Sequence, residues 1–415
     1  YDGLKKRRLD RPYIRNGKGK LEEASWEDAL ALAANRLTKT PADKIAAVTG
    51  DLCAVEDLYA FKDLMGKLGV KGVDGCVGGL SVLSEARGDY LMNTGIAGIE
   101  AADAILMIGT NPRREAALVN ARIRKVWREK RLPIGLIGEA VELTYPYEHL
   151  GDKPADIEEL AKSKSAFAKS LKDAQNLVVI LGAQSLKNKG GQAIHQAVLS
   201  LCEKLGAVKD GWNGFNMLHA DASQVAALDM GLTGTADLAK AELVYLMNVD
   251  TDQVNDISKD AFVIYQGHHG GLGAHRADII LPGAAYTEKD ALYVNTEGRV
   301  QMGKRAVFPV GEAREDWKIL RALSENCGIR LGYNSQVELR RAIVSDYPAY
   351  GAVDVLPEGN SVSTSSKGKK EDKLPAKFGA GLSSFYQTNV IARASAIMAE
   401  CAAQFEAKST KKAAE

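Results

Sequence analysis

Short, uninterrupted apolar runs recur along this chain and constrain its fold more than any other feature. They lie at residues 45–50, 104–109, 134–137, 177–182, 243–247 and 262–265. Strands whose residues are continuously apolar, without alternation, are buried on both faces. Amphipathic stretches at 55–68, 115–128 and 157–171 separate several of the runs. Strands joined by helices form parallel sheets with right-handed crossovers, so the pattern predicts an α/β protein with doubly wound parallel sheets.

Length and charge restrict the class of protein further. A chain of 415 residues is too long for one small core, so we expect two or three α/β lobes. The 54 basic and 53 acidic residues nearly cancel, which predicts no nucleic-acid partner. No apolar run reaches the length of about 18 residues that a membrane helix needs. We therefore expect no direct membrane insertion, and any link to a membrane would come through a partner.

The cysteines argue against a cluster site built within this chain. The five of them are Cys53, Cys76, Cys202, Cys327 and Cys401, widely scattered and without a Cys-x-x-Cys pair. An iron–sulfur or zinc site is therefore not expected, and the scatter suits a reducing compartment. The chain begins at Tyr1 without a leader pattern, so we expect a fragment, a processed product or one half of a split polypeptide.

The order of the patterns gives an expected domain organisation. Ser25 is a good N-cap for a first helix, residues 360–373 are rich in Ser, Lys and Gly, and residues 384–404 have one apolar side. The expected segments are an N-terminal arm and entry helix at 1–38, the first part of a first lobe at 39–85, a second lobe at 86–172, the second part of the first lobe at 173–350, a flexible linker at 351–382, and a C-terminal docking helix and tail at 383–415.

One loop has the position of a ligand site. Gly109, Asn111 and Pro112 follow an apolar strand and lead into a helix. Open α/β sheets bind ligands at such strand ends, where loop amides and helix N-termini face the ligand. Gly109 would let the backbone approach a ligand, and Asn111 could hydrogen-bond to it. The alternative is that Asn-Pro only makes a tight turn between strand and helix. No Walker-type or Gly-x-Gly-x-x-Gly motif is present.

The histidine cluster admits two interpretations. His268 and His269 are adjacent, and His275 follows closely. Three histidines could gather a metal ion, but no acidic residue lies between them and glycines dominate the loop. We interpret the segment as a polar loop at a strand end that either packs or faces a neighbour.

Residues 277–301 contain a motif of two short strands separated by a polar turn. A short strand ends at Pro282-Gly283, Thr287-Glu288-Lys289 follows, and a second β-rich run leads into Asn295-Thr296-Glu297-Gly298-Arg299. This order resembles the signature of the molybdopterin-dependent oxidoreductase superfamily. The resemblance implies the formate dehydrogenase-like fold of that superfamily, with doubly wound parallel sheets in two intertwined lobes. The superfamily contains working molybdenum enzymes and a degenerate relative inside respiratory complex I.

The resemblance also assigns expectations to site residues. Gly109, Asn111 and Pro112 match the loop that holds the cofactor in that superfamily, and Glu139 stands where an acidic residue followed by Pro-Arg reads the cofactor's nucleoside. Here no Pro-Arg follows. Cys76 lies in the region of the metal ligand, but Val77 replaces the usual following His. We therefore expect no catalytic residue, no bound cofactor and no metal, with Gly109, Asn111, Pro112 and Glu139 as vestiges of a pterin site.

Further segments resemble one branch of the superfamily, the large iron–sulfur subunit of proton-pumping NADH:ubiquinone oxidoreductase. They are residues 1–5, 25–30, 108–113, 120–125, 143–145, 149–152, 222–229, 265–270, 313–319 and 391–395. In that family the cluster-binding cysteines lie in an N-terminal region that this chain lacks. The resemblance thus implies iron–sulfur clusters in that missing region or in partners, and none in this chain.

The function that follows is a non-catalytic scaffold in the hydrophilic arm of complex I. The expected partners are other subunits of that arm, including the N-terminal iron–sulfur part of the same subunit. The expected location is peripheral, on the matrix side of the mitochondrial inner membrane or the cytoplasmic face of a bacterial plasma membrane. Two alternatives remain: an active molybdenum or tungsten oxidoreductase with Cys76 as ligand, and a nucleotide-binding α/β module outside respiration.

Overall fold

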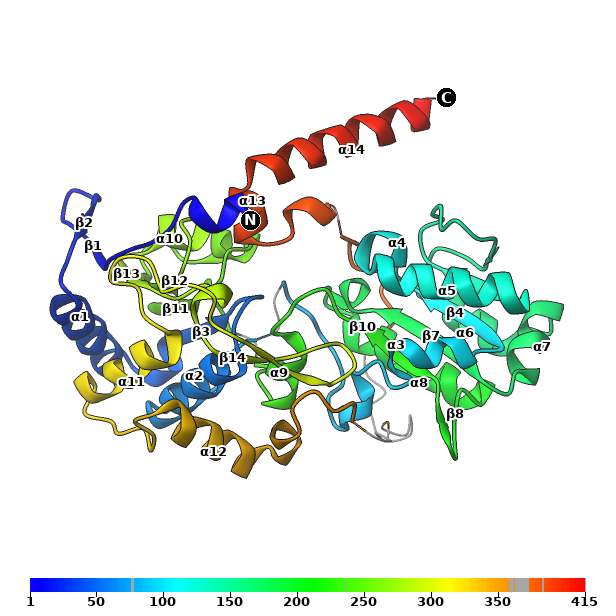
Figure 1. Cartoon of the computed structure of the whole chain (residues 1–415), viewed down its shortest axis with the longest axis horizontal. Helices are drawn as coiled ribbons and strands as arrows, with labels where there is room; N and C mark the ends of the chain where they lie inside the picture. The colour runs from blue at the N-terminus through cyan, green and yellow to red at the C-terminus, as the bar shows by residue number, and fades with distance from the viewer. Residues whose placement is uncertain (76–77, 235, 358–361, 363–372, 383, 415) are drawn as a thin grey trace.

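Two α/β lobes lie side by side in the computed structural model, each around its own sheet (Figure 1). The structure describes residues 1–75, 78–234, 236–357, 362, 373–382 and 384–414, with side chains up to residue 405. Cys76 and Val77, which the sequence singled out as a metal ligand and its neighbour, lie outside the described residues. No helix within the described ranges is both long and apolar enough to cross a bilayer.

The first lobe is built on a sheet of six strands in the order β2-β1-β13-β12-β11-β3. Four of them are parallel: β3 (Ile45–Thr49), β11 (Leu243–Met247), β12 (Phe262–Gly267) and β13 (Ile279–Pro282). The other two, β1 (Tyr13–Arg15) and β2 (Leu21–Glu23), come from the N-terminal arm and pair antiparallel at the edge. Part of that arm is therefore an integral edge of the first sheet.

The second lobe has five strands in the order β10-β7-β4-β5-β6, all parallel. They are β4 (Ala104–Ile108), β5 (Ile134–Ile137), β6 (Glu148–His149), β7 (Leu177–Gly182) and β10 (Phe215–Leu218). The predicted return to the first lobe at residue 173 is therefore wrong, because β7 pairs with β4 and β10 pairs with β7. An apolar run indicates burial on both faces, but it does not specify which sheet the strand joins.

Alternating residues of each strand in the second sheet face opposite helical layers. Ile105 and Met107 of β4 pack with Val119 and Ile123 of α5 (Ala117–Lys130). The opposite face of the sheet packs against α6 (Ala155–Lys162), α7 (Ala166–Asp173) and α8 (Gly191–Leu205). The single helix expected near 157–171 is thus two helices, with Ser165 capping the second by accepting a hydrogen bond from the Ala168 amide. Helices on both faces confirm the predicted doubly wound architecture.

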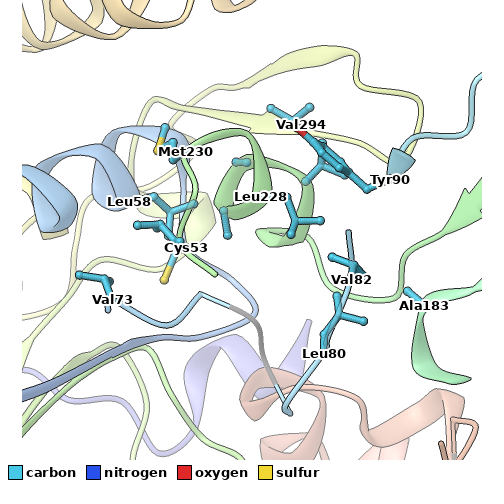
Figure 2. Packing of buried hydrophobic residues seen from close by; sticks show 14 of the residues in the cluster. Cys53, Leu58, Val73, Leu80, Val82, Tyr90, Ala183, Leu228, Met230 and Val294 are labelled. Atoms are coloured by element: carbon cyan, nitrogen blue, oxygen red, sulfur yellow. The ribbon is translucent and has the colours of Figure 1, made fainter. Parts of the chain in front are cut away.

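Four helices of the first lobe form one packed layer, and the core continues into the second lobe. Contacts connect α1 (Trp26–Lys39), α2 (Val55–Lys67), α11 (Asp316–Asn326) and α12 (Gln336–Asp346). Ser25 caps α1, as predicted, by accepting a 3.0 Å hydrogen bond from the Asp28 amide. Between the lobes, Leu58, Leu80, Tyr90 and Leu228 belong to one buried cluster (Figure 2), so the lobes share a core.

The C-terminal region departs from the sequence expectation. The single docking helix expected within 383–415 is two helices, α13 (Val390–Ala394) and α14 (Ala396–Ala414). The Phe405 ring of α14 lies 4.9 Å from the Arg114 guanidinium, and the C-terminal end of α14 extends away from the body (Figure 1). Of the linker predicted at 351–382, residues 358–361 and 363–372 lie outside the described residues. Residues 374–382 are described, however, and they contact the second lobe instead of linking freely.

Candidate functional site

Three glycines meet where adjacent strands of the second sheet end. The strand order β7-β4-β5 places Gly182, Gly109 and Gly138 side by side. Gly109 has a φ of +57°, and a Cβ added to it would lie 2.4 Å from the Cβ of Ser185. A Cβ on Gly182 would lie 2.4 Å from the Gly109 carbonyl oxygen. Close packing between these loops therefore accounts for Gly109 without a ligand.

Two donors of the Gly109 loop already bind the carboxylate of Glu115. The Thr110 hydroxyl donates to Oε2 of Glu115 at 2.5 Å, and the Asn111 amide donates to Oε1 at 3.2 Å. Burial raises the pKa of Glu115, against the opposing effect of these hydrogen bonds. Pro112 begins α4 (Pro112–Glu115), which is only four residues long. An anionic ligand at this loop would have to displace the Glu115 side chain.

The structure brings three of the predicted residues to one cavity. Gly109, Asn111 and Glu139 line a cavity of about 630 Å³, which residues 376–382 also line. Pro112 is buried behind the loop. The side-chain oxygen Oδ1 of Asn111 is buried without a hydrogen-bond partner among the described residues. The adjacent strand ends thus place Glu139 beside the Gly109 loop, as the resemblance implied, whereas its role remains a prediction.

A second cavity, of about 600 Å³, lies against both lobes and was not predicted. Two ion pairs line it: Lys187 Nζ lies 3.1 Å from Asp221 Oδ2, and Arg393 Nη2 lies 2.7 Å from Asp250 Oδ2. Burial, followed by the nearby charge of Asp221, raises the pKa of Asp51 to about 7. Asp51 follows β3 and Asp250 follows β11, so their positions just beyond buried apolar runs were the signal that could have indicated this cavity.

The described cysteines and histidines do not form a metal site. Cys53 and Cys202 are buried, and burial raises the pKa of each thiol. Within the described part of the chain, no group of three or more His, Cys, Asp or Glu residues is arranged to hold a metal ion.

The histidine pair is instead buried against the N-terminal turn. His269 Nε2 lies 2.9 Å from the Gly3 carbonyl oxygen, which can only accept, so this nitrogen carries the proton. Its Nδ1 then accepts from His268 Nδ1 at 2.5 Å. Burial lowers the pKa of His269 to about 4 and that of His268 well below its usual range. His275 is exposed. The interpretation of a packing loop thus agrees with the geometry of His268 and His269.

The first half of the signature motif forms buried ion pairs. Both carboxylate oxygens of Glu288 accept from the Arg8 guanidinium at 2.6 Å. Lys289 Nζ lies 2.5 Å from Asp57 Oδ2 and 2.9 Å from Asp316 Oδ2. Burial disfavours the charged form of Lys289, but the charges of Asp316 and Asp57 outweigh it and raise its pKa. Glu288 and Lys289 therefore connect the N-terminal arm, α2 and α11.

The second half of the motif shapes a turn that contacts the second lobe. Asn295 Oδ1 accepts from the amides of Glu297 and Arg299, each at 3.0 Å, and Gly298 takes a φ of +79°. The carboxylate of Glu297 accepts from the Ile96 amide at 2.8 Å. In both halves of the motif, the residues named here therefore hold separate segments of the fold in place.

Comparison with known proteins agrees with the motif. Residues 8–326 match the molybdopterin oxidoreductase family, and residues 356–401 match the C-terminal region of the G-type subunit of NADH-ubiquinone oxidoreductase. The mitochondrial NADH dehydrogenase [ubiquinone] iron-sulfur protein 1 of Solanum tuberosum is 42% identical over 97% of this chain and 55% of its own length. The G-type subunit of NADH-quinone oxidoreductase from Rickettsia conorii is 40% identical over 98% of this chain and 60% of its own length. The chain therefore spans little more than half the length of these relatives.

Solved structures show the same fold at low sequence identity. Acetylene hydratase from Pelobacter acetylenicus covers 85% of this chain with a TM-score of 0.60 and 11% identity, over 66% of its own chain. A formyltransferase/hydrolase complex chain from Methylorubrum extorquens covers 76% of this chain with a TM-score of 0.55 and 16% identity, over 98% of its own chain. At these identities the likeness concerns the fold alone.

Proposed function

The chain belongs to the molybdopterin oxidoreductase family, and from that premise we propose that it is a non-catalytic scaffold domain of the peripheral arm of proton-pumping NADH:ubiquinone oxidoreductase. Its relatives at about 40% identity are subunits of that enzyme complex. Within this proposal its partners are other subunits of the arm, including the iron–sulfur part of the same subunit. Electrons pass through clusters held in those partners.

The observation that carries the proposal is the Glu115 carboxylate in the Gly109 loop. It accepts from Thr110 Oγ1 and from the Asn111 amide, the donors that an anionic ligand at this strand end would use. A pterin nucleotide carries phosphate, so a half-buried carboxylate at this point occupies these donors and, in its ionised form, repels the ligand. The residues of the loop therefore fit a pterin nucleotide poorly.

The retention of the signature motif has a structural explanation under this proposal. Lys289, Glu288 and Glu297 make buried contacts between segments far apart in the chain. Removing one partner of a buried charged pair leaves the other charge uncompensated, which is strongly destabilising. The fold can thus keep these residues after the chemistry has been lost, since function lies in the site and not in the fold.

A peripheral location on the matrix side of the mitochondrial inner membrane, or the cytoplasmic face of a bacterial plasma membrane, belongs to the same proposal. It is supported by the relatives, which include mitochondrial and bacterial subunits. The chain would reach the membrane through its partners.

An active molybdopterin enzyme is the second candidate. The cavity beside Gly109 and the unpartnered Oδ1 of Asn111 favour it, because both offer room and a polar group to a ligand. In that case Cys76 would hold the metal, and Asn111 and Glu139 would contact the pterin.

The two candidates differ in what substitutions at the site do. We would introduce Cys76→Ala, Asn111→Ala and Glu139→Ala into the assembled complex and measure NADH-to-quinone electron transfer per assembled complex. A scaffold predicts unchanged turnover for all three, while deletion of the whole chain prevents assembly of the arm. Loss of turnover in a fully assembled Cys76→Ala complex would contradict the scaffold and support the enzyme.

A further inference from the structure

Two stretches near the C-terminus cross the crevice between the carboxyl ends of the two sheets. They are residues 374–382, which contact the second lobe, and residues 384–395, which reach the first lobe; together we call them the belt. We propose that the belt is a built-in occupant of this crevice, anchored in both lobes, and that it closes the crevice to any ligand that would contact both sheets. This inference goes beyond the scaffold function, since it concerns the chain by itself.

The belt is anchored in the second lobe by backbone contact. The Gly379 amide donates to the Ser185 carbonyl at 2.7 Å, and a Cβ on Gly379 would lie 2.6 Å from the Gln184 carbonyl oxygen. Phe378 packs against the main core cluster, and its Cδ1 would lie 3.3 Å from a Cβ on Gly109. Gly379 is thus required for close approach, and the phenyl ring covers the glycine of the predicted cofactor loop.

The belt is anchored in the first lobe by the buried residue Asp250. Nη2 of Arg393 donates to the Asp250 carbonyl at 2.8 Å and to its Oδ2 at 2.7 Å. Asp250 lies three residues after the end of β11 at Met247, and its side chain is 7% exposed. Charge-assisted hydrogen bonds to a buried carboxylate are among the stronger polar contacts in proteins.

The N-terminal turn, Asp2–Lys5, contacts the C-terminal end of the belt. Asp2 accepts hydrogen bonds from the Ser395 hydroxyl and, at 3.0 Å, from the Ala396 amide that begins α14. Gly3 packs so closely on α13 that a Cβ there would lie 2.0 Å from the Ile391 carbonyl oxygen. The N-terminal turn and α13 therefore meet beside the crevice (Figure 1).

The belt divides the crevice into the two cavities described above. Gly381, Leu382 and Glu115 line both of them, so these residues form the partition. On one side the predicted loop residues Gly109 and Asn111 remain, and on the other the ion pairs of Lys187 and Arg393. A ligand long enough to contact both sheets would have to displace residues 376–382.

Hydrogen exchange of the 415-residue chain, followed by mass spectrometry, tests this inference. We expect Gly379→Val to accelerate exchange in residues 374–382 and 109–115 by about tenfold or more, because local opening of a segment follows its contacts. Gly332→Val is the matched control, since nothing lies within 4 Å of a Cβ there. Peptides from β3 and β11 report whether the variant stays folded, and they should be unaffected in both.

The wild-type chain provides a second readout that does not depend on a variant folding. The Gly379 amide should exchange at least about tenfold more slowly than in an unstructured peptide. Exchange of residues 374–382 at the unstructured rate would overturn the proposal, as would equal exchange in Gly379→Val and wild type. Either result leaves the scaffold function untouched, because that function is judged from electron transfer and bound cofactor.

Discussion

Lys289 Nζ lies 2.9 Å from Oδ2 of Asp316 in a site where the two side chains are 3% and 0% exposed. The same nitrogen lies 2.5 Å from Asp57 Oδ2. Lys289 belongs to the motif by which the sequence resembles molybdopterin oxidoreductases, yet its ammonium group contacts Asp57 of α2 and Asp316 of α11. This contact shows how a residue of a family signature can be retained because the fold needs its buried ion pairs.

Replacing Lys289 tests the energetic role of the motif. Lys289→Met leaves Asp57 and Asp316 buried without their cation, and we expect the free energy of unfolding to fall by about 3–5 kcal/mol. Urea denaturation measures it. Lys240→Met is the control: that side chain is 84% exposed in its pair with Asp237, and its loss should cost under about 0.5 kcal/mol. Equal effects of the two substitutions would contradict the structural role.

The same variant makes a prediction about pH. Burial raises the pKa of Asp57 to about 7, while Lys289 opposes that rise. Without Lys289 the folded-state pKa should increase further. A carboxyl whose folded pKa is raised holds its proton in the folded state, so stability decreases as pH rises from the unfolded value toward the folded one. We therefore expect Lys289→Met to be less stable at pH 8 than at pH 5, relative to wild type; a pH-independent difference would be inconsistent.

Gly109→Ala separates packing from ligand binding. The new Cβ would lie 2.4 Å from the Ser185 Cβ at a φ of +57°, so we expect a loss of roughly 2–4 kcal/mol from clash and backbone strain together. Gly211→Ala is the control, since Gly211 has a φ of +75° and open space around it; it should lose only the strain of about 1 kcal/mol. Ser185→Gly should restore part of the difference. Equal losses at Gly109 and Gly211 would show that packing does not require Gly109.

His269 should make the chain sensitive to acid. Burial lowers its folded-state pKa to about 4, below the unfolded value of about 6.5. The unfolded chain then takes up the proton first, so stability contributed by neutral His269 is lost as pH falls from about 6.5 to 4. His269→Gln, whose side-chain amide can donate to the Gly3 carbonyl from the position of Nε2, should reduce the decrease between pH 7 and pH 5 in urea titrations. An unchanged decrease would place the acid sensitivity elsewhere.

Glu297→Ala should affect stability and leave turnover unchanged. The carboxylate accepts from the Ile96 amide at 2.8 Å and from Asn295 Nδ2 at 3.0 Å, so its loss should cost about 1–3 kcal/mol. Glu325→Ala is a surface control, since Glu325 is 65% exposed. NADH-to-quinone turnover per assembled complex should match wild type in both. A turnover defect specific to Glu297→Ala would give this residue a role in the reaction.

The strands could be predicted from the sequence because burial on both faces makes them continuously apolar. β5 (Ile134–Ile137), β7 (Leu177–Gly182) and β11 (Leu243–Met247) begin and end where their apolar runs do. The assignment of β7 to the first lobe was wrong because pairing partners are chosen by tertiary contacts. Helix α8 was not foreseen, although it lies between the neighbouring strands β7 and β10 along the chain.

Part of the site could be predicted from the order of strands and loops. Gly109 and Glu139 follow strands that are neighbours in the sheet, so their loops had to meet. The Glu115 carboxylate could not be placed in the loop, because a helical pattern does not tell which way one of its end residues turns. Phe378 and Gly379 were assigned to a linker because they follow the stretch 360–373, which is rich in Ser, Lys and Gly. Their contacts with Gly109 and Ser185 depend on the folded second lobe.

The most direct test of the scaffold is the content of molybdenum, tungsten and pterin in the native assembly that holds this chain. The metals would be measured by mass spectrometry and the pterin by fluorescence after oxidation, each relative to the amount of the chain. The scaffold predicts no metal or pterin above the background of the preparation. Near-stoichiometric metal with pterin, lost on Cys76→Ala, would contradict it and establish a working cofactor site.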